Sequence, residues 1–162
     1  MKEQKKIRVL MVCLGNICRS PMAHGVFEQL VRDSGLAARI EVDSAGTGAY
    51  HVGNPPDPRA QETMRRRRID ISDQRARQVT AEDFEAFDYV LAMDVDNHAV
   101  LERVCPPGQE EKLRLFLDFA PEMGEREVPD PYYGAGSGFD RAYDLVEAAG
   151  RGLLEEIRRR HL

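Results

Sequence analysis

Residues 7–21 of the chain read IRVLMVCLGNICRSP. The apolar run from Ile7 to Cys13 predicts a buried strand, and the apolar residues from Pro21 to Asp33 recur at helical spacing. A strand, a short polar loop and a helix in this order are typical of open α/β sheets. Ligands of such sheets bind at the carboxyl ends of the strands, so a site is expected in the loop that follows Cys13.

The rest of the chain continues the alternation of strands and helices. Asp57 followed by Pro58 predicts a capped helix start, because proline lacks only an N–H that the first helical turn leaves unused. The sequence shows no internal repeat and no interdomain linker, so residues 1–162 are expected to form one domain with a three-layer α/β fold. Further strands are predicted at 39–44, 89–93 and 113–117, and further helices at 95–104 and 139–160, with shorter helices after Asp57 and Thr80.

The composition is that of a soluble globular protein of 162 residues, 42% apolar and 31% charged. Lys and Arg number 23 against 28 Asp and Glu, a net charge of −5, which argues against a general nucleic-acid binder. The sequence contains no apolar stretch long enough to span a membrane. Three cysteines, an odd and sparse set, favour a reducing cytoplasm over a disulfide-stapled fold.

The start of the chain shares one feature with a secretory signal, since basic residues precede an apolar run. The run is interrupted by Arg8, and Gly15, Asn16 and Arg19 follow it closely. A signal peptide needs a longer apolar stretch and a small-residue cleavage site. The segment is therefore interpreted as the first strand, and a cytoplasmic protein is expected.

The loop after the first strand carries a cysteine and an arginine separated by five residues, Cys13 and Arg19, followed by Ser20. The bare spacing is common, but its context is not: a predicted strand ends at the cysteine and a helix is expected to begin at the serine. With Ser20 as N-cap and Pro21 in the first turn, free backbone N–H groups would face the loop and cradle an anion.

The residue types in this loop suit attack on phosphorus. A thiol becomes a nucleophile at neutral pH when a positive environment lowers its pKa from about 8.5. A helix N-terminus and Arg19 would supply that environment, and the planar guanidinium fork would bind two phosphoryl oxygens. Gly15 and Asn16 permit the positive φ angles of a tight loop. No Lys follows a Gly at Walker spacing, so a nucleotide-binding loop is disfavoured.

A leaving oxygen needs a proton, so a general acid is expected elsewhere in the chain. Asp130 is the best candidate, because Pro129 and Pro131 would stiffen its loop and two tyrosines follow. An Asp-Pro pair in a Gly- and Pro-rich loop also fits an ordinary turn. The residues alone leave both interpretations open.

Several motifs together closely resemble the low-molecular-weight protein tyrosine phosphatases over nearly the whole chain. These motifs are Cys13 to Ala23, Asp43-Ser44-Ala45-Gly46-Thr47, Asp57-Pro58-Arg59-Ala60, Arg75-Ala76-Arg77-Gln78, Ala92-Met93-Asp94 and Asp130-Pro131-Tyr132-Tyr133-Gly134. The resemblance implies a four-stranded parallel sheet flanked by helices. It also implies a phosphocysteine intermediate, with no metal and no cofactor.

The resemblance assigns roles residue by residue. It implies that Cys13 is the nucleophile, that Arg19 clamps the phosphate, and that Asp130 is first the acid and then the base for water. Asn16, Ser20 and Ser44 resemble the family's polar network. The phosphate loop and aromatic slot implied by the family comprise Leu14, Gly15, Asn16, Ile17, Cys18, Ser20, Ser44, Tyr50, Tyr132 and Tyr133. The expected partners are phosphotyrosine-containing proteins and a cognate tyrosine kinase, without nucleic acid or membrane, and a monomer is expected.

One position departs from the resemblance. Gln74 stands where the family often carries a histidine before the Arg-Ala-Arg stretch. An amide can hydrogen-bond in place of an imidazole, so the expectation is loss of a tunable charge without loss of activity. His24 lies beside the loop, but a lone helical histidine is interpreted as structural or solvated. Arg65 to Arg68 are interpreted as a solvated face at a helix end.

The cysteines other than Cys13 have two interpretations. Cys18 is either a second thiol that traps oxidised Cys13, which the resemblance favours, or a small buried packing residue. Cys105 precedes a Pro-Pro-Gly stop and is expected to be inert.

Four other functions are weighed against a tyrosine phosphatase. Arsenate reductases share the loop but need further cysteines to relay a disulfide. Arginine phosphatases typically have threonine where this chain has Ile17. A zinc module built on Cys13, Cys18 and His24 lacks a fourth ligand at the usual spacing. A non-catalytic phosphoprotein binder would have no use for both a thiol and an acid.

Overall fold

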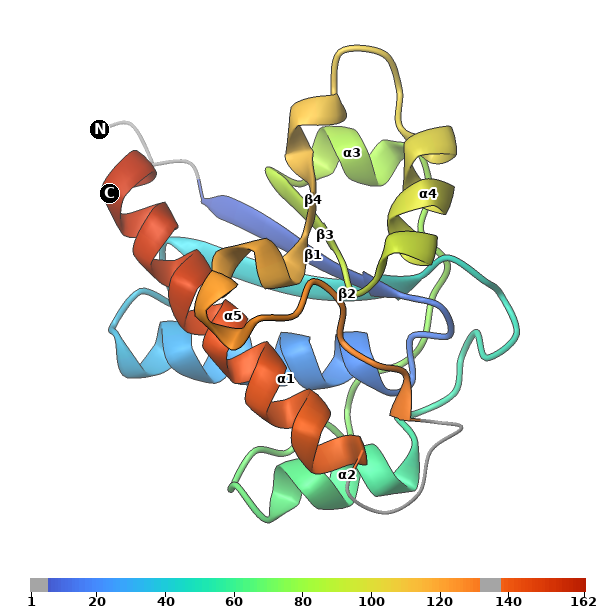
Figure 1. The fold of residues 1–162 in the computed structure, drawn as a ribbon, viewed down its shortest axis with the longest axis vertical. Coiled ribbons are helices and arrows are strands. Elements are labelled where there is room, and N and C mark those ends of the chain that lie inside the picture. Colours follow the sequence, from blue (N-terminus) through green and yellow to red (C-terminus); the bar gives the residue numbers. More distant parts are fainter. Residues whose placement is uncertain (1–5, 132–137) are drawn as a thin grey trace.

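The computed structural model describes residues 6–131 and 138–162. At its centre is a four-stranded parallel sheet in the order β2-β1-β3-β4, which confirms the predicted α/β class (Figure 1). The strands are β1 (Ile7–Cys13), β2 (Ile40–Gly46), β3 (Tyr89–Ala92) and β4 (Leu113–Leu115). Because β1 lies between β2 and β3, the loop that follows Cys13 emerges from the middle of the sheet.

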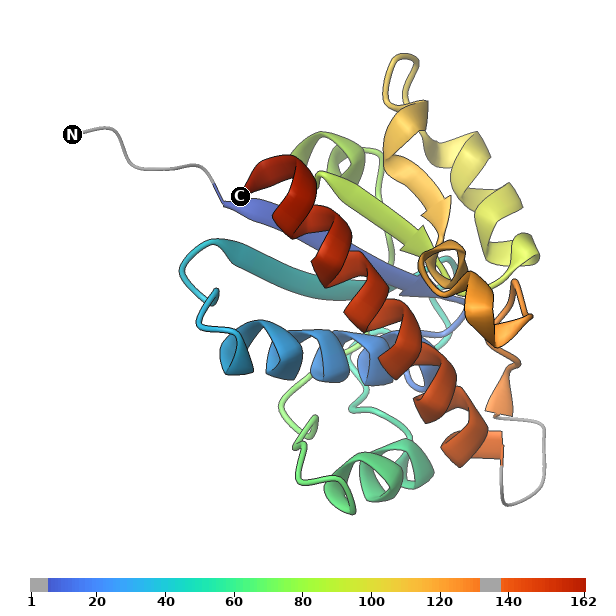
Figure 2. The same cartoon turned by 60° about the vertical axis from the view of Figure 1, so that its left-hand side comes forward.

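Helices cover both faces of the sheet (Figure 1 and Figure 2). One face carries the long helices α1 and α5, and the other carries α3 and α4. The helices are α1 (Arg19–Asp33), α2 (Pro58–Arg65), α3 (Glu82–Ala86), α4 (Val95–Val104) and α5 (Gly138–His161), and short 3₁₀ turns occur at Glu110–Lys112, Phe116–Phe119 and Pro121–Met123. The three-layer arrangement explains why β1 is apolar on both faces.

The side chains of β1 alternate between two hydrophobic cores. Val9 and Met11 pack with residues of α1 and α5, whereas Leu10 and Val12 pack with residues of α3 and α4. All of these side chains are fully buried. A polar substitution at any of them would leave an unsatisfied group in a core, so the sequence of β1 is set by packing until the strand ends at Cys13.

The ends of β1 and β2 lie together at one edge of the sheet, where Cys13 pairs with Gly46. A Cβ atom at Gly46 would lie 2.7 Å from the carbonyl oxygen of Leu14. The glycine therefore allows the end of β2 to approach the loop after Cys13 closely. This contact brings residues 14–18 against the segment that follows β2.

Three predicted boundaries differ from the structure by two residues. The second strand runs to Gly46, two residues beyond the predicted end at 44. The fourth ends at Leu115, and Phe116–Phe119 form a 3₁₀ turn instead of continuing it. That turn packs on α5, where the carbonyl of Phe119 lies so close to Gly152 that no Cβ would fit, and this tertiary contact overrides the extended pattern. Helix α1 begins at Arg19 after a Cys18 cap, so Ser20 is not its N-cap.

The predicted start of α2 is confirmed. Asp57 is its N-cap, its carboxylate accepts the backbone N–H of Arg59, and Pro58 is the first helical residue. The backbone N–H of Asp57 donates to the carbonyl of Ile17 at 2.8 Å. The cap therefore also fastens the start of α2 to the loop after Cys13.

Candidate active site

Cys13 ends β1 and is only 3% exposed, at the base of a cleft of about 370 Å³. Its sulfur lies 3.0 Å from the hydroxyl of Ser20. The cleft is lined by Cys13, Leu14, Gly15, Ile17, Cys18, Arg19, Tyr50, His51 and Asp130. It thus contains the expected nucleophile and clamp, which are close in sequence, together with the expected acid, which is more than 100 residues away in the chain.

The loop of residues 14–18 offers its backbone as an anion-binding surface. In the described part of the chain, none of its backbone N–H groups donates a hydrogen bond to a protein acceptor. Consecutive unpaired N–H groups at the start of a helix form a concave site for an anion with several oxygens. The unpaired N–H groups lie where the sequence predicts an anion cradle, although Cys18 and not Ser20 precedes the helix.

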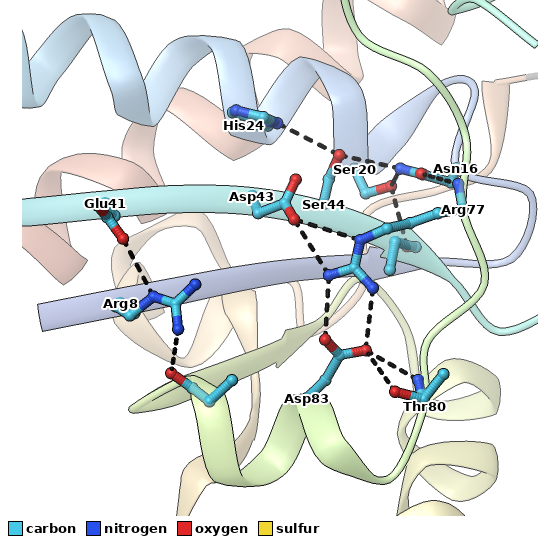
Figure 3. Close-up of polar contacts among 12 residues, drawn as sticks. Arg8, Asn16, Ser20, His24, Glu41, Asp43, Ser44, Arg77, Thr80 and Asp83 are labelled. Atoms are coloured by element: carbon cyan, nitrogen blue, oxygen red, sulfur yellow. Dashed lines mark hydrogen bonds and ion pairs between the residues drawn. The ribbon is translucent and has the colours of Figure 1, made fainter. Parts of the chain in front are cut away.

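Asn16 holds this loop from within. Its backbone has φ of 57°, in the left-handed region that asparagine tolerates better than most residues. Its Nδ2 donates to the hydroxyls of Ser20 at 2.8 Å and Ser44 at 3.0 Å, and its Oδ1 accepts the backbone N–H of Arg77 at 3.0 Å (Figure 3). Both side-chain N–H groups and the carbonyl are thus occupied, which fixes the orientation of the amide.

This arrangement determines what the Ser20 hydroxyl does. Because its oxygen accepts from Asn16, its own proton is available for the Cys13 sulfur at 3.0 Å or the Ala45 carbonyl at 3.4 Å. A hydrogen bond to a thiolate is charge-assisted and therefore the stronger choice when Cys13 is ionised. The serine supports the nucleophile in place of the capping role expected from the sequence.

Arg19 is 3% exposed, and hydrogen bonds to protein groups hold its guanidinium. Its Nη1 donates to Asp94 at 2.6 Å and to the Val128 carbonyl at 3.0 Å, and its Nη2 lies 3.5 Å from Asp130. Burial opposes the charge of Arg19, but the nearby Cys13 and Asp94 outweigh burial and raise its pKa. The guanidinium therefore stays charged at the rim of the cleft.

Asp130 comes from the segment between β4 and α5 and lines the same cleft as Cys13. Its carboxylate is 28% exposed, enough to reach a ligand while remaining close to Arg19. The turn interpretation of this aspartate does not explain why it lines the same cleft as Cys13. The geometry favours the acid interpretation.

The aromatic slot is only partly described. Tyr50 and Leu14 both line the cleft, but Tyr50 is 82% exposed. Tyr132 and Tyr133 lie outside the described residues. Sequence reasoning missed His51, which also lines the cleft next to Tyr50. The sequence signal for His51 was its position next to Tyr50, which was already expected to line the aromatic slot.

Sequence reasoning noted Asp94 as part of a motif and as a second choice for the general acid, but did not predict its contact with Arg19. It lies two residues after the end of β3, where a parallel sheet places its ligand-binding residues, and it pairs with Arg19. Its other oxygen accepts the backbone N–H of Asn97 at 2.7 Å and caps α4. The sequence alone does not show that one carboxylate both pairs with Arg19 and caps α4.

Gln74 and His24 both meet the Ser44 hydroxyl. Gln74 accepts from it at 3.5 Å and donates to the Pro21 carbonyl at 3.1 Å, so the amide does hydrogen-bond where a histidine was expected. His24 Nδ1 lies 3.3 Å from the same hydroxyl (Figure 3), which favours the structural interpretation of this histidine over the solvated one. The polar network thus extends onto α1.

Cys18 is buried in the same cleft, whereas Cys105 is not among its lining residues. Burial, followed by the charge of Asp57, raises the pKa of the Cys18 thiol.

Within residues 6–131 and 138–162, no three His, Cys, Asp or Glu side chains converge as a metal site requires. In the same residues, no helix combines the length and the apolar character needed to cross a bilayer.

Comparison with known proteins gives concordant matches. The family model described as "Low molecular weight phosphotyrosine protein phosphatase" matches residues 8–161. The protein of that name from Schizosaccharomyces pombe is 48% identical over 154 residues, covering 94% of this chain and 98% of the relative. The crystal structure of YfkJ from Bacillus subtilis superposes with a TM-score of 0.94 at 38% identity, covering 99% of this chain and 100% of YfkJ.

An arginine phosphatase is also similar. The crystal structure of DARP, the Drosophila arginine phosphatase, has a TM-score of 0.87 at 31% identity and covers 94% of this chain and 98% of that one. Substrate preference within this fold therefore has to be argued from the cleft itself.

Proposed function

The chain belongs to the low molecular weight phosphotyrosine protein phosphatase family, and from this membership we propose that Cys13, Arg19 and Asp130 carry out its reaction. The activity is that of a cysteine-dependent protein tyrosine phosphatase acting on phosphotyrosine in proteins. The observation that carries the residue assignment is the cleft in which the Cys13 sulfur, the unpaired N–H groups of residues 14–18 and Arg19 meet.

The first step transfers the phosphoryl group to sulfur. The loop N–H groups and Arg19 bind the phosphoryl oxygens, with Nε and Nη2 as the available edge because Nη1 is held by Asp94. The Cys13 thiolate attacks phosphorus in line as the bond to the tyrosine oxygen breaks. Asp130 gives its proton to that oxygen, so the leaving group departs as a neutral phenol.

The second step releases phosphate. Asp130, now a carboxylate, takes a proton from a water molecule, whose oxygen attacks phosphorus and breaks the bond to sulfur. The products are phosphate and the Cys13 thiolate, which Ser20 stabilises through its hydroxyl at 3.0 Å. Arg19 and the loop N–H groups stabilise the charge that develops on the equatorial oxygens in both steps.

The finer assignments rest on the same cleft. Leu14 and Tyr50 line its entrance, which favours a flat aryl ring over a small alkyl phosphate. Ile17 offers no hydroxyl, which argues for phosphotyrosine over phosphoarginine. We further infer a monomeric, cytoplasmic enzyme of one domain, acting opposite a tyrosine kinase, since the chain has a fold of modest size with few cysteines.

The proposal is tested by hydrolysis of p-nitrophenyl phosphate and a phosphotyrosine peptide in the presence of EDTA, by wild type and by Cys13→Ser. Wild type is expected to be active, and Cys13→Ser is expected to fall to background, because a serine hydroxyl at this site is not ionised. Incubating both proteins with ³²P-labelled peptide and quenching in acid should trap label on wild type only. Activity that survives in Cys13→Ser would remove Cys13 from the mechanism.

A further inference from the structure

Residues 76–79 form a short extended segment beside the end of β2. The carbonyl of Arg77 accepts the backbone N–H of Gly46, and the N–H of Val79 donates to the carbonyl of Gly46, both at 2.8 Å. Gln78 is bridged in parallel to Gly46. Since Gly46 is also the residue that approaches Leu14 closely, the segment supports the 14–18 loop from behind.

The backbone N–H of Arg77 completes the hydrogen bonds of Asn16. It donates to Asn16 Oδ1 at 3.0 Å, while Nδ2 of the same amide donates to Ser20 and Ser44. If the Arg77 backbone moved, the amide could rotate and release the Ser20 hydroxyl. The position of this one N–H group therefore bears on the contact between Ser20 and Cys13.

The Arg77 side chain anchors that backbone with two carboxylates. Its Nε and Nη2 donate to Asp43 at 3.2 and 3.1 Å, and its Nη1 and Nη2 donate to Asp83 at 3.0 and 3.1 Å (Figure 3). Asp83 is nearly buried and also accepts the backbone N–H of Thr80 at 2.8 Å. Burial alone would lower the pKa of Arg77, but hydrogen bonds and charge from Asp83 and Asp43 raise it.

We propose that Arg77, clamped between Asp43 on β2 and Asp83 on α3, is a positioning residue that holds Asn16 and thereby the Cys13 nucleophile. The clamp joins three parts of the molecule at one point: the middle of β2, the start of α3 and the 14–18 loop. Asn16 keeps an unfavourable positive φ, and such a conformation persists only where the surroundings over-determine it. The proposal rests on the function proposed above.

The chain contains a matched control in Arg8. Arg8 is on β1, and its Nε donates to Glu41 on β2 at 3.1 Å while its Nη1 donates to the Ala86 carbonyl at 3.0 Å (Figure 3). It therefore also links the sheet to α3, and its guanidinium stacks on Phe87. It makes no contact with the 14–18 loop, because it lies at the opposite end of β1. A merely structural arginine should behave like Arg8.

The experiment compares wild type, Arg77→Met, Arg77→Lys and Arg8→Met. Three quantities are measured: the melting temperature, kcat and KM on p-nitrophenyl phosphate, and the pH midpoint at which iodoacetate alkylates Cys13. In Arg77→Met, kcat is expected to fall about 10- to 100-fold, the effect of a small misplacement of reacting groups. The alkylation midpoint should rise, because the thiolate loses support from Ser20. Arg77→Lys should recover part of both effects, since it keeps the charge without the fork.

Arg8→Met should lower the melting temperature while kcat and the alkylation midpoint stay at wild-type values. A folded Arg77→Met with wild-type kcat and alkylation midpoint would overturn the proposal. The proposal would also be overturned if Arg8→Met lost as much kcat as Arg77→Met and shifted the alkylation midpoint as far. If Arg77→Met does not fold, Asp43→Asn weakens the exposed arm of the clamp and should shift both readouts less, in the same direction. A wild type that is alkylated but inactive would refute the proposed function, while the shift in midpoint would still test the clamp.

Discussion

Asp94 lies 2.6 Å from Nη1 of Arg19 through one carboxylate oxygen and caps α4 with the other. The guanidinium is thereby fixed to the start of α4, just beyond the end of β3. A clamp that is already oriented loses little freedom when phosphate binds, which leaves more of the binding energy for the transition state. The pair is mostly buried, so solvent screens it weakly.

Asp94→Asn is expected to lower kcat/KM about tenfold, a loss of about 1.4 kcal/mol in transition-state stabilisation. The amide oxygen can still cap α4, so the change isolates the charge that orients Arg19. Steady-state kinetics on p-nitrophenyl phosphate measure the loss. Arg19→Lys is the companion variant and should lose more, about 10² to 10³ in kcat, because a point charge cannot replace the fork. Near-normal turnover in Arg19→Lys would mean that the clamp is misassigned.

Asp130→Ala is expected to lower turnover on phosphotyrosine by about 10² to 10³, because the leaving phenol then departs without a proton. The loss should be smaller on aryl phosphates whose leaving groups are already stable as anions. A series of aryl phosphates with leaving groups of increasing pKa measures this as a steeper dependence in the variant. Asp140, which pairs with Arg66 and Arg67 away from the cleft, gives the control Asp140→Ala. Equal losses on good and poor leaving groups would place the acid elsewhere.

Much of the fold followed from local patterns. Apolar runs predicted the four strands, and Asp57 with Pro58 predicted the start of α2, because burial and capping act over a few neighbouring residues. Phe116 and Leu117 were predicted as the end of the fourth strand, since their apolar character suits either element. The segment forms a 3₁₀ turn because it packs against Gly152 on α5. That contact joins residues far apart in the sequence, so the local pattern could not predict it.

The same division applies to the site. Cys13 and Arg19 are close in sequence, so their chemistry was visible in one loop. Ser20 was expected to cap α1, because a serine before a helix usually does. Its hydroxyl is instead committed to Asn16 and Cys13, which depends on how the loop curls. Asp94 and the Arg77 clamp act across elements that only the folded sheet brings together, so local spacing contains no sign of them.

Phosphotyrosine peptides are expected to be hydrolysed with higher kcat/KM than matched phosphoserine and phosphoarginine peptides. Leu14 and Tyr50 line the entrance for a flat ring, and loss of one such contact should cost on the order of 1 kcal/mol. Tyr50→Ala should therefore lower kcat/KM on phosphotyrosine peptides several-fold while inorganic phosphate still inhibits as in wild type. Ile17→Thr adds a hydroxyl to the loop and should raise the share of phosphoarginine turnover. Comparable efficiency of wild type on phosphoarginine would overturn the substrate assignment.

Mild peroxide is expected to inactivate the enzyme reversibly through a disulfide between Cys13 and Cys18. Peroxide first oxidises the Cys13 thiolate to a sulfenic acid with release of hydroxide. The Cys18 sulfur then displaces hydroxide from that sulfur to form the disulfide, and added dithiothreitol returns the two electrons. Both cysteines are free, buried and part of one cleft. A disulfide requires Cα atoms about 4.4 to 6.8 Å apart, a span compatible with the two ends of a tight loop.

The pH dependence of this protection follows from Cys18. Burial first, and then Asp57, raises the pKa of its thiol, so at neutral pH it is protonated and attacks slowly. The recoverable share of activity after peroxide should therefore increase as the pH is raised, because more Cys18 becomes thiolate before Cys13 is oxidised further. Cys18→Ser should keep its activity but recover poorly with dithiothreitol at every pH, whereas Cys105→Ser should match wild type. Peptide mapping that finds no Cys13 to Cys18 link, together with full recovery of Cys18→Ser, would leave Cys18 as a packing residue.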